Sequence, residues 1–484
     1  MQPEVLSAVL MAPSRYDEKG VLVFRFGINQ NGSLSTLAGL VKDYNRRHEG
    51  RREIRCEIFD EHVREPVTAK LLEAWRDEAA SRGERFVLLL CGVQTPTYPR
   101  ARDVALTAKS LGIDVLAGGV HLSCHGPSVE FLARSGVSVG IGEVEPIWDE
   151  VMEDAFSGTL RPLYRLDAAQ GVRVKTAVED ITATDLPTAP FPDMPRRYLG
   201  SYLNPRHHYI DTSRGCPYVC TFCAVKNTFG RTMRSRDPDA LVAWMTERVE
   251  NGDADWFTFT DDNFVRNPLH LEVLEGLAKA RERGTDISVA LILDVEASCY
   301  AREDSKRGER TRHFLEMCQK AGVSNVFIGL DSTNDAALRE MKKNQNRDRG
   351  AKPEDVHRAI LERYRVAVRA WQEIGASVEC GYILGFDADG VGAGKQAADD
   401  MVAIGVDIVT FYLLTPLPGA EDYARALQQG TLLETDFNEY FRNRTMVGHP
   451  VLAPEELDAE LAGAVRSYFS WPRVVARLAR GLFG

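Results

Sequence analysis

The chain has 484 residues, a length at which two or three domains of ordinary size are expected. Its composition, 44% hydrophobic and 27% charged, is that of a globular protein and excludes collagen-like, fibrous or extensively disordered architectures. The 59 basic and 70 acidic side chains give a formal net charge of −11, which is the wrong sign for a protein that coats nucleic acid.

Short apolar runs alternate with segments of helical spacing in the first third of the chain. The predicted strands are Val5–Met11, Ile54–Asp60, Phe86–Cys91, Val115–Gly118 and Val137–Ile141, and the predicted helices are Ser33–Asn45, Thr68–Arg82, Tyr98–Leu111 and Val144–Phe156. Alternating strands and helices are typical of a parallel sheet covered by helices. The sequence therefore predicts an α/β domain over residues 1–160, doubly wound and Rossmann-like.

A second α/β unit follows a segment rich in proline and threonine, residues 161–205, which we interpret as a surface linker. The next predicted strands are Tyr209–Thr212, Trp256–Thr260, Ser288–Leu293, Asn325–Leu330, Ser377–Ile383 and Ile408–Leu414. Strands separated by helical crossovers in this number resemble a partial (β/α)6 barrel of the TIM type more than an open sheet. We expect the barrel at 206–420 and a short helical region at 421–484.

The chain ends in a segment with the pattern of a basic amphipathic helix. Three arginines fall at i, i+4 and i+7, opposite four aliphatic residues: Arg473, Arg477 and Arg480 against Val474, Val475, Leu478 and Leu482. Two interpretations stay open, a terminal helix docked on the barrel and a helix in peripheral contact with a membrane surface.

The hydropathy pattern predicts neither a secretory signal nor a membrane span. The N-terminal segment lacks a basic region followed by an apolar stretch, and no apolar run approaches the roughly 20 residues of a spanning helix. Nine cysteines, scattered except for one cluster, argue against a disulfide framework. We therefore expect a cytoplasmic protein with reduced thiols.

The clustered cysteines are Cys216, Cys220 and Cys223, in a C-x3-C-x2-C arrangement just after the first predicted barrel strand. Three thiolates on a short loop can bind three irons of a [4Fe–4S] cluster and leave the fourth iron open for chemistry. A structural zinc site is the alternative, and it needs a fourth ligand such as His207 or His208. Three unrelated core cysteines are a further alternative.

This motif resembles the signature of the radical SAM superfamily, CxxxCxΦC with an aromatic residue at Φ, here Phe222. In that superfamily the open iron binds the amino and carboxylate groups of S-adenosylmethionine. An electron from the reduced cluster then cleaves the sulfonium to give a 5′-deoxyadenosyl radical. The resemblance implies that the protein supplies orientation and excludes side reactions, while the cofactors supply the radical.

Later strand ends resemble the S-adenosylmethionine-binding motifs of the superfamily, in the expected order. Asp261 and Asp262 follow the second strand, where relatives bind the amino group. Asp331 and Ser332 end the fourth strand, where relatives often carry Glu-Ser against the ribose and carboxylate; the aspartate is one methylene shorter. These positions match the expectation that barrel active sites form at the carboxyl ends of the strands.

Glycines and arginines complete the S-adenosylmethionine site that the resemblance implies. Gly381 and Gly385 on the fifth strand would let the backbone approach the adenine. Arg234 and Arg236 follow the cysteine loop and are candidates for pairing with the carboxylate. A solvated helix entrance is the alternative interpretation of the two arginines.

An α/β domain before such a barrel resembles the cobalamin-binding subgroup of the superfamily, which includes hopanoid methylases and the anaerobic Mg-protoporphyrin monomethyl ester cyclase. The strand-end residues expected at the cobalamin are Gln94, Thr95, Gly118, Gly119, Gly142 and Glu143. The D-x-H-x-x-G motif of proteins that ligate cobalamin through histidine is incomplete: Asp60 and His62 are in place, but Glu65 stands where glycine belongs. His62 is therefore not expected to be a ligand, and an empty fold that shapes the substrate channel stays an alternative.

The leading hypothesis is a radical SAM enzyme that uses cobalamin to methylate an unactivated carbon. The alternative is radical cyclisation, ring rearrangement or C–C coupling of a lipid, tetrapyrrole or natural-product scaffold without methyl transfer. A binding protein that only senses the cofactors is a third hypothesis, disfavoured by the intact cysteine motif. The expected partners are a small-molecule or lipid-like substrate and an electron donor of the flavodoxin or ferredoxin type.

Overall fold

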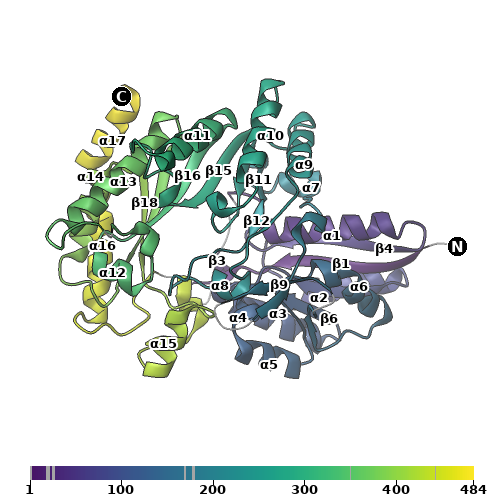
Figure 1. Ribbon diagram of the computed structural model, residues 1–484. Helices are drawn as coiled ribbons and strands as arrows, with labels where there is room; N and C mark the ends of the chain where they lie inside the picture. Colours follow the sequence, from purple (N-terminus) through teal and green to yellow (C-terminus); the bar gives the residue numbers. More distant parts are fainter. Residues whose placement is uncertain are drawn as a thin grey trace.

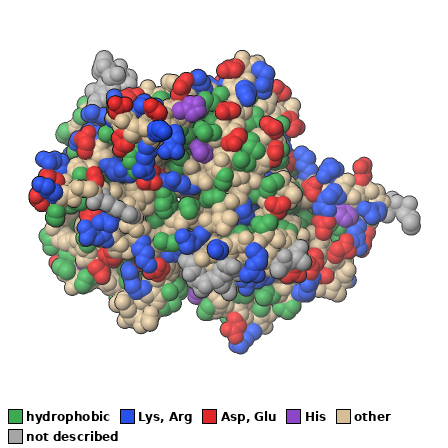
Figure 2. Space-filling model, viewed as in Figure 1, with side chains coloured by type: hydrophobic (Ala, Val, Ile, Leu, Met, Phe, Trp, Pro, Cys, Tyr) green, Lys and Arg blue, Asp and Glu red, His purple; other side chains and the backbone are tan. Residues whose placement is uncertain are grey.

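The computed structural model describes residues 3–17, 22–23, 28–167, 170–176, 180–348, 350–441 and 443–483. An N-terminal α/β unit, purple and blue in Figure 1, packs beside a teal and green barrel. The C-terminal helices α16 (Pro454–Tyr468) and α17 (Trp471–Phe483) lie on the side of the barrel away from that unit. Basic and acidic side chains are interspersed over the face of the molecule drawn in Figure 2.

The N-terminal unit is a six-stranded parallel sheet in the order β4-β1-β5-β6-β7-β8. Its strands are β1 (Glu4–Ala12), β4 (Arg52–Asp60), β5 (Arg85–Leu90), β6 (Asp114–Gly118), β7 (Ser138–Ile141) and β8 (Leu163–Arg165). All five strands predicted for this unit are therefore confirmed.

Helices cover both faces of this sheet. One face carries α1 (Gly32–Arg47) and α6 (Trp148–Ser157), and the other carries α2 (Ala69–Ser81), α3 (Tyr98–Ser110) and α5 (Gly126–Arg134). Along β1, Leu10 packs toward α1 and α6, whereas Val9 and Met11 pack toward the opposite layer. Burial on both faces explains why the strands appear in the sequence as continuous apolar runs.

The segment predicted as a linker contains regular structure. It supplies β8, an antiparallel hairpin of β9 (Val172–Lys175) and β10 (Asp180–Ala183), and the short helix α7 (Arg196–Leu199). In β8 only Tyr164 is buried between two exposed residues, so a three-residue strand leaves too little alternation for the sequence to reveal it.

The second unit is a parallel sheet in the order β11-β14-β15-β16-β17-β18. The strands are β11 (His207–Ile210), β14 (Trp256–Phe259), β15 (Ser288–Asp294), β16 (Val323–Asp331), β17 (Ser377–Leu384) and β18 (Ile408–Leu413). The crossover helices are α9 (Pro238–Glu250), α10 (His270–Glu282), α11 (Lys306–Lys320), α13 (Val356–Glu373) and α14 (Ala393–Ile404). Within the described residues β11 and β18 do not pair, so the barrel is open, and the predicted fold class is confirmed.

The C-terminal helices are fastened to the barrel by polar contacts. Glu460 of α16 accepts the backbone N–H groups of Gly392 (2.7 Å) and Gly394 (2.8 Å) and so caps α14. In α17, Arg473 pairs with Asp399, and Arg477 donates to the Tyr468 carbonyl oxygen (3.0 Å). Two of the three terminal arginines therefore face the protein.

The third terminal arginine, Arg480, has a side chain outside the part of the chain that the structure describes. In contrast to Arg473 and Arg477, Trp471 is 81% exposed. Over the described residues, no helix combines the length and the apolar character needed to cross a bilayer.

Candidate functional site

The three clustered cysteines lie on one loop at the carboxyl end of the first barrel strand. A two-residue antiparallel pair, β12 (Ser213–Arg214) and β13 (Arg234–Ser235), closes this loop at its neck. Gly215 adopts φ +102°, and a side chain there would come within 2.6 Å of the Thr232 carbonyl oxygen. The tight turn into Cys216 therefore requires glycine.

The outer side of the loop is held by neighbouring segments. The backbone N–H of Thr221 donates to the Met341 carbonyl oxygen (3.1 Å), and its hydroxyl donates to Asp422 (3.0 Å). Asp422 belongs to α15 (Glu421–Gln429) and returns a backbone N–H to the Thr221 carbonyl oxygen (3.1 Å). The cysteine loop is thus fixed from the barrel and from the C-terminal region.

The thiols of this loop are partly or fully buried. Burial raises the pKa of Cys216 to about 11 and that of Cys223 to about 12. Bound iron reverses this preference, because a coordinating thiol is deprotonated. Among the described side chains, no three of the ligating types are gathered closely enough for one metal ion, whereas each cysteine of a cluster binds a different iron.

The zinc alternative receives no support from the two histidines. His207 shares a hydrogen bond with the Thr258 hydroxyl (2.7 Å), and the ring of His208 is bonded to the Asp253 carbonyl oxygen (3.1 Å). Both residues begin β11, whereas the cysteine loop follows the end of that strand. Because they lie at the start of the strand, neither imidazole is placed as the fourth ligand of a zinc ion on the loop.

A buried lysine beside the cysteines was not found by the sequence analysis. Lys343 is 7% exposed, pairs with Asp331, and has its ammonium 5.9 Å from the centre of the Phe222 ring. Burial lowers its pKa, while the cysteine thiols and Asp294 act in the opposite direction. Its neighbour Lys342 points outward to Glu421 (2.6 Å), and nothing in the sequence distinguishes the two lysines.

The ends of β16 and β17 lie beside Lys343 and form one wall of the site. The register of the pair shifts between Gly329 and Asp331, and Asp331 takes a left-handed φ of +60°, which is rare for a residue other than glycine. A Cβ at Gly329 would lie 2.7 Å from the Lys343 ammonium. One at Gly381 would touch Tyr412 (3.6 Å) and approach Asp331 (3.9 Å).

Ser332 and Gly385, two further residues predicted at the site, form hydrogen bonds with residues close to them in the sequence. Ser332 is buried, and its hydroxyl accepts the Asn334 N–H (3.0 Å). Gly385, at φ +98°, donates its N–H to Asp389 (2.9 Å).

The two aspartates after β14 differ in their partners. Asp261 accepts the backbone N–H (2.9 Å) and the hydroxyl (2.6 Å) of Thr212 and a bond from Ser213, so it fastens the start of the cysteine segment. Asp262 accepts only the N–H of Gly215 (3.1 Å) among the hydrogen bonds described. Burial raises the pKa of Asp261 to about 6 and that of Asp262 to about 7, and Asp262 has the freer carboxylate.

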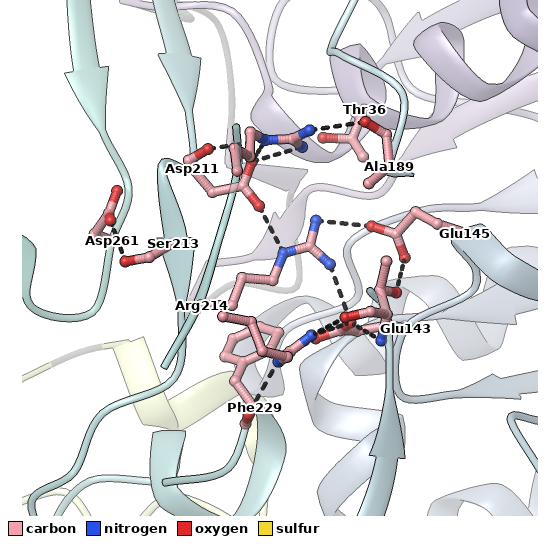
Figure 3. A network of polar contacts seen from close by, with 12 residues as sticks. Thr36, Glu143, Glu145, Ala189, Asp211, Ser213, Arg214, Phe229 and Asp261 are labelled. Atoms are coloured by element: carbon pink, nitrogen blue, oxygen red, sulfur yellow. Dashed lines mark hydrogen bonds and ion pairs between the residues drawn. The ribbon is translucent and has the colours of Figure 1, made fainter. Parts of the chain in front are cut away.

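Arg234 and Arg236 are engaged elsewhere than the sequence analysis expected. Arg234 makes a bidentate pair with Glu143 of the N-terminal unit (2.7 and 2.8 Å). Arg236 pairs with Asp211 (2.9 Å) and donates to the Ala189 carbonyl oxygen (2.9 Å). Neither guanidinium is left for the carboxylate of S-adenosylmethionine. Both belong to a network that crosses between the units, in which Figure 3 labels Glu143, Asp211 and Arg214.

A second polar group at the barrel mouth, at the end of β15, was also missed. Arg266 pairs with Asp294 and Glu296 (both 2.7 Å), and Asn263 donates to Asp294 (2.9 Å). Tyr218, within the cysteine loop, donates to Glu296 (3.3 Å). Polar residues directly after the third predicted strand were the available signal.

The carboxyl edge of the N-terminal sheet carries the residues expected at a cobalamin. Gly119 has φ +150°, and a side chain there would collide with the backbone of Val93. Thr95 is bonded to His121 (3.2 Å), and Gln94 opens the adjoining turn with its N–H on the Thr97 hydroxyl (3.0 Å).

Two further glycines predicted at the cobalamin, Gly118 and Gly142, lie at the same edge of the sheet. Gly142, at φ +77°, donates to the Ser123 hydroxyl (2.9 Å), and Gly118 accepts the Val93 N–H (3.0 Å). At this edge, glycines leave parts of the backbone without side chains, and the nearby polar side chains are short. His62 is held by Asp60 (2.8 Å).

This edge lies against the cysteine loop. Helix α4 (Val120–Cys124) packs on α8 (Val225–Thr228), which follows Cys223. A Cβ at Gly419 would lie 2.5 Å from the Cys124 sulfur and 3.4 Å from Ala224. The barrel mouth and the carboxyl edge of the N-terminal sheet therefore share one interface.

Comparison with known proteins agrees with this geometry. The family model of the radical SAM superfamily matches residues 210–367. The chain is 27% identical over 316 residues to bacteriochlorophyllide d C-12(1)-methyltransferase of Chlorobaculum tepidum, covering 64% of this chain and 59% of that protein. It is 25% identical over 341 residues to the hopanoid C-2 methylase of Rhodopseudomonas palustris, covering 70% and 56%. The matches thus span less than two thirds of the length of these curated relatives.

A solved structure extends the likeness to both units. The radical S-adenosylmethionine methyltransferase TsrM from Kitasatospora setae, with cobalamin and [4Fe–4S] cluster bound, superposes with a TM-score of 0.64 at 14% identity. The superposition covers 96% of this chain and 91% of TsrM, so the fold is shared throughout. A [4Fe–4S] cluster and S-adenosylmethionine are the cofactors that the matching family implies. Residues 210–367 form a domain of the radical SAM superfamily.

Proposed function

We propose that this protein is a radical SAM methyltransferase that uses cobalamin to methylate an unactivated carbon of a small molecule. The observation that carries the proposal is the meeting of two edges: the barrel mouth with its cysteine loop packs against the glycine-rich carboxyl edge of the N-terminal sheet. Open α/β sheets bind cofactors at the carboxyl ends of their strands, and α/β barrels carry their active sites at the same ends of theirs.

In this proposal Cys216, Cys220 and Cys223 hold the [4Fe–4S] cluster. When bound, the cluster supplies the electron that cleaves S-adenosylmethionine to methionine and a 5′-deoxyadenosyl radical. Lys343 is a cation buried next to the loop and binds the carboxylate, because Arg234 and Arg236 are paired with Glu143 and Asp211.

The remaining contacts to S-adenosylmethionine follow from the strand ends. Asp262, the less engaged of the two aspartates, accepts from the amino group. Asp331 and Ser332 contact the ribose, and the adenine approaches the backbone at Gly381 and Gly385. Asp261 instead supports the start of the cysteine segment.

Cobalamin is assigned to the carboxyl edge around Gln94, Thr95, Gly118, Gly119 and Gly142, where it supplies the methyl group. The open space beside Gly142, where an added Cβ would meet no atom within 4 Å, supports this placement. His62 is held by Asp60 and is not proposed as a ligand. Glu143 is not proposed as a cobalamin contact, because its carboxylate is already paired with Arg234.

The test is anaerobic purification with cluster reconstitution and hydroxocobalamin, followed by iron, sulfide and cobalt analysis and by product analysis with S-adenosylmethionine and a reductant. About four irons and one cobalt per chain, with 5′-deoxyadenosine and S-adenosylhomocysteine as products, are expected. Four irons and 5′-deoxyadenosine without cobalt or S-adenosylhomocysteine would reject methyl transfer in favour of cyclisation, rearrangement or coupling. Absence of iron would reject the radical SAM assignment.

The localisation and the partners are also proposals. We infer a cytoplasmic enzyme with a small-molecule or lipid-like substrate and a flavodoxin- or ferredoxin-type electron donor. Any peripheral membrane contact would use the apolar side of α17, since Trp471 and Val475 are exposed while Arg473 and Arg477 bind the protein. Co-sedimentation with anionic phospholipid vesicles tests it: the wild-type chain should bind, and a Trp471→Ser, Val475→Ser variant should bind at least about tenfold less. Equal sedimentation of the two would remove the membrane proposal.

A further inference from the structure

The neck of the cysteine loop places two positive charges side by side. In the β12–β13 pair, Arg214 and Arg234 are direct register partners, and every residue between them belongs to the loop that carries the three cysteines. Like charges directly opposite each other on neighbouring strands destabilise the pair. Both side chains are also largely buried, 13% and 6% exposed, so water screens their repulsion weakly.

The compensating charge comes from the other unit. Glu143, which follows β7 at the carboxyl edge of the N-terminal sheet, pairs with Arg234 (2.7 Å) and with Arg214 (3.3 Å). Its carboxylate also accepts the backbone N–H of Thr184 (2.7 Å). Figure 3 shows Glu143 joined to Arg214 of the neck.

Further ion pairs extend this buried network beyond Glu143. Glu145 pairs with Arg214 (2.7 Å), and Asp211 pairs with both Arg214 (2.6 Å) and Arg236 (2.9 Å). Three carboxylates thus meet three guanidinium groups. Burial opposes ionisation of Glu143, but Arg214 and Arg234 outweigh it and hold its pKa below the ordinary value. Loss of this one carboxylate leaves an uncompensated positive charge at the neck.

We propose that Glu143 is a positioning residue through which the N-terminal unit closes the neck of the cysteine loop and holds the three cysteines in place for S-adenosylmethionine cleavage. The inference rests on the proposed function and deepens it, because it makes the N-terminal unit part of the cluster site. In this inference Glu143 pairs with Arg234. Glu143 therefore does not contact cobalamin, and Arg234 does not contact S-adenosylmethionine.

The central experiment compares Glu143→Gln, Arg234→Gln and the double variant with the wild-type chain. Removing one partner of a buried ion pair leaves the other charge buried and unpaired, which destabilises the fold. Replacing both partners often leaves the stability unchanged. Amide hydrogen exchange of residues 215–233 in the iron-free protein should accelerate at least about tenfold in each single variant. The double variant should return to within about threefold of wild type.

The reconstituted protein provides the second measurement. The electron paramagnetic resonance spectrum of the reduced cluster, with and without S-adenosylmethionine, reports the geometry of the loop directly. We expect both single variants to keep their iron, to broaden this spectrum, and to form 5′-deoxyadenosine at least about tenfold more slowly. A rate and spectrum restored in the double variant would identify the ion pair as the cause.

Glu153→Gln is the matched control, because Glu153 lies on α6 and pairs with Arg52 inside the N-terminal unit. Glu143→Asp keeps the charge and should protect the loop at least about threefold better than Glu143→Gln, which decides the matter if the glutamine variant does not fold. Wild-type exchange and spectrum in Glu143→Gln, or a double variant no better than the singles, would overturn the inference. A wild-type chain that forms no 5′-deoxyadenosine would count against the proposed function alone, since exchange in the iron-free chain needs no turnover.

Discussion

Lys343 and Asp331 form a buried ion pair beside the cysteine loop, and both members are held in unusual states. The lysine is buried among thiols and carboxylates, and the aspartate has a left-handed backbone at a bulge of β16. Strain of this kind persists only where the surroundings impose it, and it concentrates at functional sites. An arriving carboxylate would compete with Asp331 for the ammonium and free the aspartate for the ribose.

The first prediction concerns Lys343→Met. It should raise the KM for S-adenosylmethionine about 10- to 100-fold, because a hydrogen bond to a charged group contributes roughly 1.5–3 kcal/mol, and it should change kcat much less. Equilibrium dialysis of S-adenosylmethionine against reconstituted protein measures the affinity. Lys342→Met, at the neighbouring exposed lysine that pairs with Glu421, is the control and should bind normally. An unchanged affinity in Lys343→Met would remove the lysine from the proposed site.

The second prediction concerns His121, which lies buried between Thr95 and Ser128. Burial, with a smaller contribution from His125, lowers its pKa to about 3. The unfolded chain takes up this proton near pH 6.5, whereas the folded chain does not. The contribution of the neutral imidazole to stability is therefore complete above pH 6.5 and is lost as the pH falls toward 3, by up to about 1.4 kcal/mol per pH unit.

Urea unfolding between pH 7 and pH 5 measures this dependence. In His121→Asn the free energy of unfolding should fall less steeply with decreasing pH than in the wild-type chain. His313→Asn, at an exposed position on α11, should keep the wild-type slope. The same slope in all three proteins would show that His121 is not the titrating group.

At the scale of single elements, two helical glycines have opposite surroundings. Gly39 in α1 lies against the Phe191 carbonyl oxygen, and an added Cβ would collide with it. Gly463 in α16 has open space where a Cβ would be. Alanine favours a helix interior over glycine by about 1 kcal/mol, so packing alone decides the sign of each substitution.

The third prediction is that Gly463→Ala raises the melting temperature and Gly39→Ala lowers it. The first variant gains helix propensity at no steric cost, with up to about 1 kcal/mol of added stability. The second must displace the backbone at Phe191, which belongs to the segment joining the two units. Thermal unfolding followed by circular dichroism compares them. A stabilised Gly39→Ala would show that the segment at Phe191 yields without cost.

The sequence was informative wherever a local pattern determined the element. Strands buried on both faces stand out as apolar runs, and the cysteine spacing lies within one loop, so both were predictable. The roles of Arg234 and Lys343 were not, because they depend on partners far away in the chain. Glu143 and Arg234 lie 91 residues apart in the sequence. Lys343 points inward to pair with Asp331, which lies at a bulge of β16.

At the scale of the whole molecule, the C-terminal region joins the two units a second time. Its turn η7 (Phe437–Phe441) places Phe437 edge-on against His121 (ring centres 4.7 Å apart) and His125 (5.1 Å). Tyr98 stacks on His121 (4.4 Å) and also contacts Phe437 edge-on (6.0 Å). The same region grips the cysteine loop through Asp422, so one short segment contacts both proposed cofactor edges.

The fourth prediction is that Phe437→Ala loosens this second connection without unfolding either unit. Edge-to-face aromatic contacts contribute about 0.5–1.5 kcal/mol beyond their buried area, and the phenyl ring contacts several rings at once. Hydrogen exchange should accelerate about tenfold at 94–98 and 119–125, while the helices α10 and α11 of the barrel keep their protection. Leu433→Ala, at a side chain that is mostly exposed, is the control. If exchange at these segments stays at wild-type rates in Phe437→Ala, the aromatic contacts of Phe437 do not hold the two edges together, and the packing of α4 on α8 and the ion network at Glu143 suffice.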